Sequence, residues 1–217
     1  MKRAPRVAAV QDISGFGRCS MTVALPVLSA MGAQCCPLPT AYLSAHTAFP
    51  ELGKAAFLDL TRELEQTQEH WAALGVALDA VYSGFIGSAG QIAAIRRFYE
   101  RFRGADTVVL CDPVMGDGGR PYRTYTPDMC RAMGELAALA DVITPNLTEA
   151  ALLLGEEYAD APGSETAARA WLERLSRDGR RSVVLTGLSF TGGEIGAGYF
   201  DAAAVSYTHL RPHETLS

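Results

Sequence analysis

The segment "TVVLCDPVMGDGG", residues 107–119, joins a run of β-branched and apolar residues to a turn that is rich in glycine. The run Val108–Leu110 is typical of a strand that is buried on both faces of a parallel sheet. Asp112 ends this strand, and Asp117 lies in the turn. Open parallel sheets bind ligands beyond the carboxyl ends of their strands, so the two carboxylates indicate a binding site.

Strand-like and helix-like segments alternate along the rest of the chain. Short apolar runs predict strands at residues 6–12, 34–40, 79–84, 107–112, 141–146 and 181–186. Apolar residues at helical spacing predict helices at residues 20–32, 55–74, 88–103, 127–140, 147–155 and 164–178. Ser88 is the expected N-cap of its helix. The alternation predicts an α/β fold in one domain, with a mainly parallel central sheet and helices on both faces.

The composition excludes several classes of protein. The chain has 217 residues, of which 48% are hydrophobic and 20% are charged, as in an ordinary globular domain. Its net charge of -5 and its lack of Lys/Arg blocks argue against a nucleic-acid partner. No run of about 18 apolar residues indicates a membrane span, and the five cysteines form no C-x-x-C pair. We therefore expect a cytoplasmic protein with small, buried, reduced thiols.

Two common nucleotide-binding motifs are absent or incomplete. The segment "GFGRCS", residues 15–20, gives G-x-G-x-x-S after a predicted strand. A dinucleotide site also needs an acidic residue about 20 positions later. The matching segment "CPLPTAY", residues 36–42, contains none, and no G-x-x-x-x-G-K-[ST] P-loop occurs in the sequence.

Polar and small residues recur at the predicted carboxyl ends of the strands. Besides Asp112 they occupy residues 12–15, 83–85, 144–146 and 186–187. Mg²⁺ typically takes one or two carboxylates and completes its octahedron with water and phosphate oxygens, so Asp112, Asp117 and Glu149 are candidate ligands. There are also purely structural alternatives. Asp112 and Asp117 could only shape a turn, and Asn146 with Glu149 could only form a helix capping box.

Six segments together resemble the pyridoxal and pyridoxamine kinases of the ribokinase superfamily. They are "VQDISGFG", "LPTAYLSAHT", "YSGFIGS", "CDPVMGDGG", "TPNLTEAALL" and "VVLTG", and they extend from residue 6 to about residue 200. The resemblance implies a ribokinase-like fold and transfer of the ATP γ-phosphate to the 5′-hydroxymethyl group of a vitamin B6 vitamer. It also implies Mg²⁺ as a cofactor, often with a monovalent cation such as K⁺, and a homodimer.

The resemblance assigns roles to individual positions. On the ATP and metal side it implies Asp112, Asp117, Thr144, Asn146, Glu149, Thr186 and Gly187. Asn146 and Glu149 belong to an N-x-x-E element that orders the magnesium–water shell. For the pyridine pocket it implies Asp12, Ser14, Thr47 and Phe85.

Two positions of the implied pocket depart from the family pattern. Phe85 stands where tyrosine is frequent, so a ring is available for stacking on the pyridine without a hydroxyl group. Asp12 stands where serine is frequent. Its carboxylate could suit the amine of pyridoxamine, and this is a hypothesis.

One family element is missing from the sequence. Members of the family carry G-[TA]-G-D after a "GAGYFD"-like strand, and the aspartate of this element is the base for the substrate hydroxyl. Residues 191–198, "TGGEIGAG", contain glycines without that aspartate. Residues 205–217 resemble no ribokinase element. We therefore expect an incomplete kinase domain over residues 1–204 that lacks the last strand and helix elements, a non-native tail over 205–217, and an inactive polypeptide.

Three alternatives remain open. A hydroxymethylpyrimidine kinase of thiamin synthesis acts on a similar flat ring with a hydroxymethyl arm, although "SAHT" and "QDISG" favour the B6 group. A non-catalytic protein that binds B6 vitamers would also agree with the missing base. The least specific alternative is an α/β domain that binds another phosphorylated ligand.

Overall fold

The computed structural model describes residues 3–46, 49, 54–190, 195–203 and 206–213. The chain divides into two compact units, Met1–Leu110 and Cys111–Ser217. The prediction of one domain over residues 1–204 stays a prediction.

Three strands of the first unit form a parallel sheet, as the sequence predicts. β1 (Arg6–Ser14) lies between β2 (Gln34–Leu43) and β4 (Ala80–Ser83), and both pairings are parallel. A short strand, β3 (Phe57–Asp59), adds to the far side of β2 in the antiparallel direction. β3 pairs only with residues 41–43 of β2. At Pro37 and Pro39 the only described neighbour of β2 is therefore β1, and prolines are tolerated at such edge positions of a sheet.

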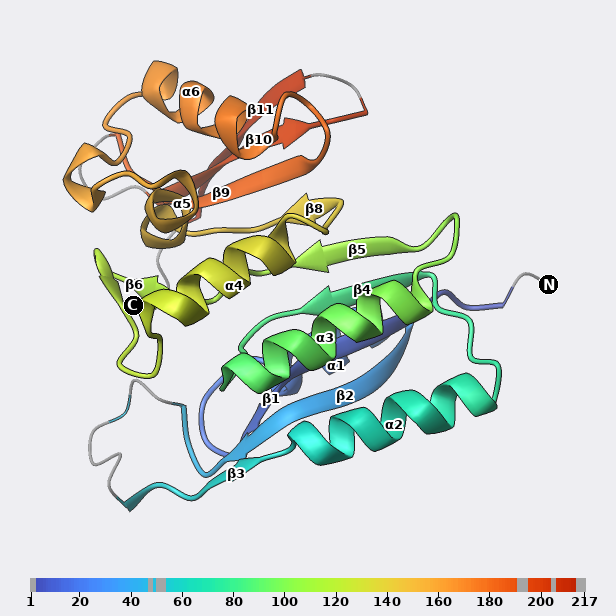
Figure 1. Ribbon diagram of the computed structural model, residues 1–217. Coiled ribbons are helices and arrows are strands. Elements are labelled where there is room, and N and C mark those ends of the chain that lie inside the picture. Colours follow the sequence, from blue (N-terminus) through green and yellow to red (C-terminus); the bar gives the residue numbers. More distant parts are fainter. Residues whose placement is uncertain (1–2, 47–48, 50–53, 191–194, 204–205, 214–217) are drawn as a thin grey trace. The chain divides into compact units, whose positions relative to one another are not determined.

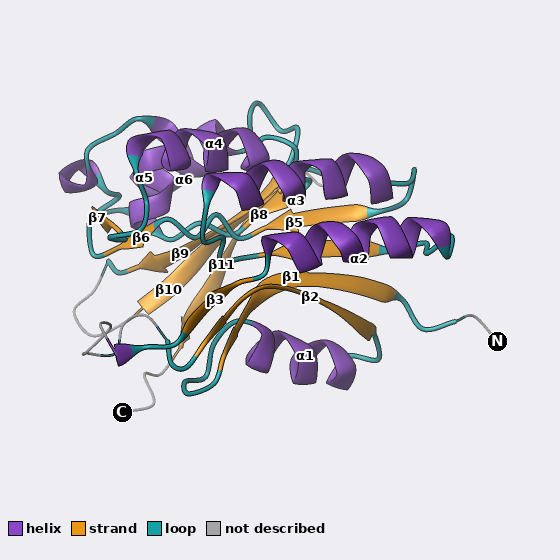
Figure 2. Cartoon of the chain, turned by 60° about the horizontal axis from the view of Figure 1, so that its bottom comes forward, coloured by secondary structure: helices purple, strands orange, loops and turns teal. Residues whose placement is uncertain are grey.

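Helices cover both faces of this sheet, which confirms that expectation for the first unit. α1 (Met21–Ala30) lies on one face, and α2 (Thr61–Ala73) and α3 (Ala89–Phe102) lie on the other (Figure 2). Ser88 caps α3 as expected, since its hydroxyl oxygen accepts the N–H of Gln91 at 3.3 Å.

The prediction of one helix over residues 55–74 is wrong at its start. Residues 57–59 are an edge strand, and Phe57 is 54% exposed although its spacing suggested a buried helical position. Asp59 ends the strand and accepts the N–H of Thr61 at 2.8 Å, at the first residue of α2. Side-chain capping of this kind competes with continuation of a helix.

The second unit contains a mixed sheet. β8 (Val142–Ile143) is parallel to β9 (Ser182–Leu188), and β10 (Ile195–Asp201) runs antiparallel to β9. Residues of the expected tail form β11 (Ser206–His213), which is antiparallel to β10. β5 (Val108–Cys111) spans the point where the units divide.

Two helices pack on one face of this sheet. α5 (Leu147–Leu154) contacts β9, and α6 (Glu165–Leu175) contacts both β9 and β10 (Figure 1). Leu172, Leu185 and Phe200 are each at most 3% exposed in the resulting core. The remaining elements of this unit are the β6 (Gly116–Asp117) and β7 (Arg120–Pro121) hairpin, α4 (Pro127–Ala137) and a 3₁₀ turn at Tyr158–Asp160.

The predicted α/β fold with a mainly parallel sheet is thus confirmed, and the antiparallel strands β3, β10 and β11 lie outside the six segments predicted as strands. All five cysteines are free, but only Cys111 is buried, so the prediction of buried thiols is wrong for the other four. No helix among the described residues is long and apolar enough to cross a membrane.

Candidate nucleotide and metal site

A capping box organises the segment between β8 and α5. The side-chain oxygen of Asn146 accepts the N–H of Glu149 at 2.9 Å, and Oε2 of Glu149 accepts the N–H of Asn146 at 2.9 Å. The capping box that the spacing of these two residues predicted is therefore confirmed. The box fixes the first turn of α5 directly beyond the end of β8.

The same two side chains also bind the turn that follows β5. Oε1 of Glu149 accepts the N–H of Met115 at 3.1 Å, and Nδ2 of Asn146 donates to the carbonyl of Gly116 at 2.9 Å. The two motifs that carried the resemblance, "DPVMGD" and "TPNLTEA", are therefore joined by hydrogen bonds.

Asp112 lies at the end of β5 beside this network. The hydroxyl group of Thr144 donates a hydrogen bond to its carboxylate, and the N–H of Thr144 donates to the carbonyl of Cys111 at 3.3 Å. Burial raises the pKa of Asp112 to about 6. Burial, and next the negative charge of Asp112, raise the pKa of Glu149 to about 8. Both pKa shifts favour the protonated carboxyl groups, and a cation bound beside them would oppose the shifts.

Glycines fix the hairpin that holds Asp117. Gly118 and Gly119 have φ of 57° and 79°, where glycine is strongly favoured. The N–H of Gly119 donates to the hydroxyl of Thr148 at 2.9 Å, and a Cβ at Gly119 would come within 2.6 Å of the Tyr158 ring.

The expectation that Asp112, Asp117 and Glu149 are joint metal ligands stays a prediction. Within the described residues, no three His, Cys, Asp or Glu side chains come together as a metal site. Both oxygens of Glu149 already accept backbone N–H groups. Asp117 is exposed at the hairpin, and its Oδ1 accepts the N–H of Gly118 at 2.8 Å.

The donors still fit a hydrated divalent cation held by one carboxylate. Asp112 supplies a hard oxygen ligand, and Mg²⁺ commonly takes one or two carboxylates and keeps several waters. A cation there would also offset the repulsion that raises the pKa of Glu149. Asp112 is accordingly the residue that could hold the metal, and Glu149 braces the backbone around it.

Thr186 and Gly187 lie next to this segment. Thr186 forms a parallel bridge with Asn146, and its N–H donates to the carbonyl of Pro145 at 2.9 Å. Gly187 is exposed with φ of 79°, and a Cβ there would meet nothing within 4 Å. The structure therefore brings the two predicted nucleotide-side residues to the same strand ends as Asn146.

Sequence reasoning missed Tyr122 at this site. It directly follows the hairpin, and its N–H donates to the carbonyl of Met115 at 2.9 Å. Burial, and then the negative charges of Glu149, Asp117 and Asp112, raise the pKa of its phenol. No local pattern in the sequence distinguishes Tyr122 from an ordinary loop tyrosine.

The predicted pocket residues of the first unit gather at the end of β1. The hydroxyl of Ser14 donates to Asp12 at 2.8 Å, and the two residues are 1% and 3% exposed. Phe85 is half-buried, and its carbonyl accepts the hydroxyl of Thr40 at 3.1 Å. Thr47 lies outside the described residues.

Gln11 is a second residue that sequence reasoning missed. Its side chain is 4% exposed and lies against Gly84, where a Cβ would be 3.1 Å from Cδ of Gln11. Its amide nitrogen is the buried side-chain atom without a hydrogen-bond partner among the described residues. A buried donor of this kind indicates an acceptor that is supplied from elsewhere. The only signal in the sequence is a polar residue inside an apolar strand.

A model of the phosphomethylpyrimidine kinase family matches residues 25–208. The chain belongs to the phosphomethylpyrimidine kinase family. It is also 32% identical over 192 residues to the pyridoxal kinase PdxY of Deinococcus radiodurans and 30% identical over 196 residues to that of Pseudomonas syringae pv. tomato. These matches use 84% and 88% of the chain and span 62% and 66% of the relatives' lengths.

Solved structures superimpose on 94% to 100% of the chain. A phosphomethylpyrimidine kinase from Bacteroides thetaiotaomicron is 37% identical, with a TM-score of 0.91, over 100% of this chain and 74% of that one. A second crystal form under the same name contains pyridoxal and is 39% identical, with a TM-score of 0.88, over 94% and 71% of the two chains. Pyridoxal kinase from Lactobacillus plantarum is 31% identical, with a TM-score of 0.84, over 100% and 74%. The predicted resemblance to ribokinase-like B6 kinases is confirmed.

Proposed function

We propose that this chain binds Mg·ATP and a B6 vitamer and belongs to an enzyme that transfers the γ-phosphate to the vitamer's 5′-hydroxymethyl group. The observation that carries the proposal is the pair of carboxyl groups of half-buried Asp112 and buried Glu149, held at the joined "DPVMGD" and "TPNLTEA" segments. The relatives named pyridoxal kinase and the pyridoxal in a 39% identical structure support the choice of substrate.

Each residue on the nucleotide side has a task in this proposal. Asp112 holds the cation, and Thr144 orients the Asp112 carboxylate. Glu149 is a positioning residue, because its carboxyl group holds the N–H groups of Met115 and Asn146. Mg²⁺ bound at Asp112 would neutralise phosphate charge during transfer. Thr186 and Gly187 offer a hydroxyl and an unobstructed backbone to the nucleotide.

The residues at the end of β1 bind the vitamer in the same proposal. Asp12 accepts a hydrogen bond from the substrate, and the amine of pyridoxamine is the donor with the best charge match. Gln11 donates its amide N–H to a substrate or water oxygen, which would satisfy its unpaired nitrogen. Phe85 stacks on the pyridine ring, and Thr47 belongs to this group by resemblance alone.

Phosphoryl transfer also needs a general base, and the 217 residues contain no G-[TA]-G-D element. A base contributes roughly 10²–10⁴ in rate, and one oxyanion donor contributes about 10²–10³. We therefore expect the chain to bind both substrates and to be inactive in phosphoryl transfer.

A substrate panel tests this function. The chain is incubated with Mg·ATP and pyridoxal, pyridoxamine, pyridoxine or hydroxymethylpyrimidine, and binding and product formation are measured separately. Binding of ATP and of a B6 vitamer without product formation agrees with the proposal, and turnover at a rate near that of an intact family member would contradict the expected inactivity. Selective binding of hydroxymethylpyrimidine would favour the thiamin alternative, which the description of the family model also names. Tight vitamer binding without any ATP binding would favour the non-catalytic alternative.

We also propose that the protein is cytoplasmic, that it forms a homodimer and that it uses K⁺. The free thiols fit a reducing compartment. The exposed apolar side chains Val23, Leu25 and Val27 on α1, with Met31 just after it, are 40% to 76% exposed and would suit burial against a second copy.

A further inference from the structure

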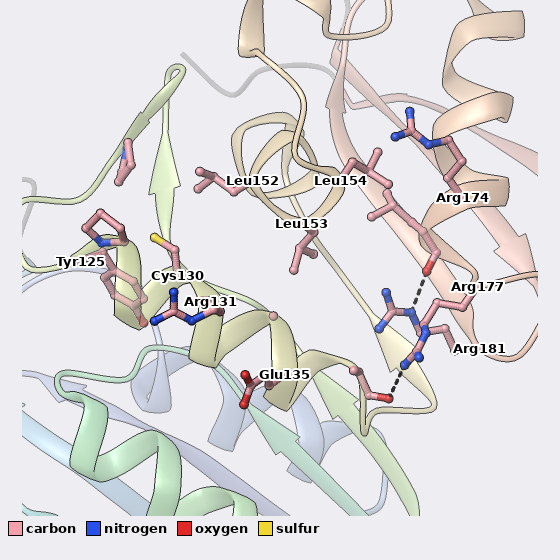
Figure 3. Close-up of a pocket in the computed structure, with 15 residues that line it drawn as sticks. Tyr125, Cys130, Arg131, Glu135, Leu152, Leu153, Leu154, Arg174, Arg177 and Arg181 are labelled. Carbon is pink, nitrogen blue, oxygen red and sulfur yellow. Dashed lines mark hydrogen bonds between the residues drawn. The ribbon is translucent and has the colours of Figure 1, made fainter.

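A groove in the second unit lies apart from every predicted site residue. It has a volume of about 770 Å³ and is bounded by α4, the end of α5, and the end of α6 with the turn into β9 (Figure 3). Pockets for small molecules commonly span roughly 300–1,000 Å³. Apolar side chains make up much of its surface, among them Leu152, Leu153, Leu154 and Leu175.

The charges around the groove are mainly positive. Arg131, Arg174, Arg177 and Arg181 line it together with a single acid, Glu135. The whole chain carries a net charge of -5, so this is a local reversal of sign. Ion pairs account for two of these arginines: Arg131 binds Asp128 at 2.7 Å, and Arg174 binds Glu156 at 2.7 Å.

Arg177 and Arg181 have no carboxylate partner among the described residues. Nε of Arg181 donates to the carbonyl of Leu175 at 2.7 Å, and its Nη1 donates to the carbonyl of Ala137 at 2.6 Å. Nη1 of Arg177 donates to the carbonyl of Ala138 at 3.1 Å. The two arginines thus bind the carboxyl-terminal ends of α4 and α6, whose partial negative charge offsets part of theirs.

These contacts use two of the three guanidinium nitrogens of Arg181 and one of the three of Arg177. Each guanidinium has five N–H donors, and Arg181 is only 7% exposed, so water cannot surround its charge freely. Burial, and then the positive charge of Arg177, lower the pKa of Arg181 to about 10. Figure 3 shows the two side chains next to each other at the α6 side of the groove, near Leu153 and Leu154.

We propose that this groove binds a small organic anion whose phosphate or carboxylate group lies between Arg177 and Arg181 and whose apolar body rests on Leu153 and Leu154. The planar guanidinium fork suits both oxyanions. An inorganic ion would leave the leucines uncovered, because it fills only a small part of 770 Å³. The proposal is independent of the B6-kinase function, since none of the residues assigned to ATP, metal or vitamer lines the groove.

The test uses four probes on the isotope-labelled full chain, with amide NMR signals as the readout. Phenyl phosphate and benzoate combine an anion with a ring, inorganic phosphate lacks the ring, and benzyl alcohol lacks the charge. The expected result is that phenyl phosphate or benzoate shifts the signals around Leu153 and Arg177, with higher affinity than either of the other two probes. A stronger response to phenyl phosphate identifies an organic phosphate as the ligand class, and a stronger response to benzoate identifies a carboxylate.

A matched pair of variants locates the site. Arg177→Gln removes an exposed charge that lines the groove, and the affinity for the anionic probe should fall at least about tenfold. Arg180→Gln removes an exposed arginine that does not line it, and the affinity should not change. The proposal is overturned if neither anionic probe shifts these signals at millimolar concentration. Equal binding of benzyl alcohol, or an equal effect of the two substitutions, would overturn it as well.

Discussion

Glu149 accepts a hydrogen bond of 3.1 Å from the backbone N–H of Met115, which ties the first turn of α5 to the turn after β5. The same carboxyl group accepts the N–H of Asn146 at 2.9 Å. One side chain therefore holds two segments that are distant in the sequence. Its pKa of about 8 reflects burial first and the nearby negative charge of Asp112 second.

Removal of this carboxyl group should destabilise the second unit. Glu149→Ala leaves the N–H groups of Met115 and Asn146 without their acceptor, at a cost of about 1–3 kcal/mol for each buried donor. Urea unfolding measures the change. Glu157→Ala, at an exposed position, is the control and should change the free energy of unfolding by less than about 0.5 kcal/mol. Equal effects of the two substitutions would contradict the bracing role of Glu149.

The metal-free protein should lose stability as the pH rises. The pKa values of Asp112 and Glu149 are raised from 3.8 to about 6 and from 4.5 to about 8. The folded state therefore favours their protonated forms. The resulting contribution to the free energy of unfolding is complete below about pH 4 and is lost as the pH rises through 6 and 8. One pKa unit corresponds to about 1.4 kcal/mol, so the loss should exceed about 1 kcal/mol.

Urea unfolding in EDTA at several pH values measures this effect. Mg·ATP should reduce the loss of unfolding free energy with rising pH, because a bound cation compensates the ionised carboxylates. Asp112→Asn should also reduce it and should stabilise the metal-free protein at pH 8. A free energy of unfolding that stays constant between pH 5 and 8.5 in EDTA would show that these carboxyl groups are not protonated in the fold.

Gly119 should be less tolerant of substitution than its neighbour. Gly119→Ala combines a φ of 79° with a Cβ 2.6 Å from the Tyr158 ring, whereas Gly118→Ala has a φ of 57° and meets nothing within 4 Å. A non-glycine residue in this region costs on the order of 1–3 kcal/mol, and the contact with Tyr158 adds to that cost at Gly119 alone. The difference in melting temperature between the two variants measures the cost of the contact with the Tyr158 ring. Equal melting temperatures would contradict such a cost.

Asp12 should set the preference between vitamers. Its carboxylate is buried with Ser14 and can pair with the amine of pyridoxamine. Asp12→Ser should weaken pyridoxamine binding by about tenfold relative to pyridoxal, because a charge-assisted hydrogen bond is lost. Tryptophan fluorescence titrations with both vitamers measure the ratio, with Asp59→Ser as the exposed control. The hypothesis fails if the ratio survives Asp12→Ser unchanged.

Local patterns account for what the sequence predicted correctly. The parallel strands β1 and β9 contain the apolar runs Val7–Val10 and Val183–Leu185, and Ser88 carries the chemistry of an N-cap. The helix over 55–74 failed at its start because pairing of Phe57–Asp59 with β2 is a tertiary contact that overrides helical spacing.

Features that depend on side chains distant in the sequence could not be predicted from local patterns. The unpaired amide of Gln11, the position of Tyr122 and the arginine groove each need elements that only the fold brings together. Glu149 shows both limits at once. Its capping box was visible in the spacing, whereas its hydrogen bond to Met115 was not, because Met115 comes close to Glu149 only in the fold.

Calorimetric titration of ATP into the 217-residue chain, with Mg²⁺ and with EDTA, tests the central claim most directly. Asp112→Asn removes the proposed cation ligand and keeps an acceptor for Thr144, and Asp106→Asn at an exposed position is the matched control. The predicted result is Mg²⁺-dependent binding that Asp112→Asn weakens at least about tenfold, while Asp106→Asn leaves it unchanged. The account would be contradicted if the chain bound ATP as tightly in EDTA as with Mg²⁺, and if the Asp112→Asn variant bound Mg·ATP as tightly as the unchanged chain.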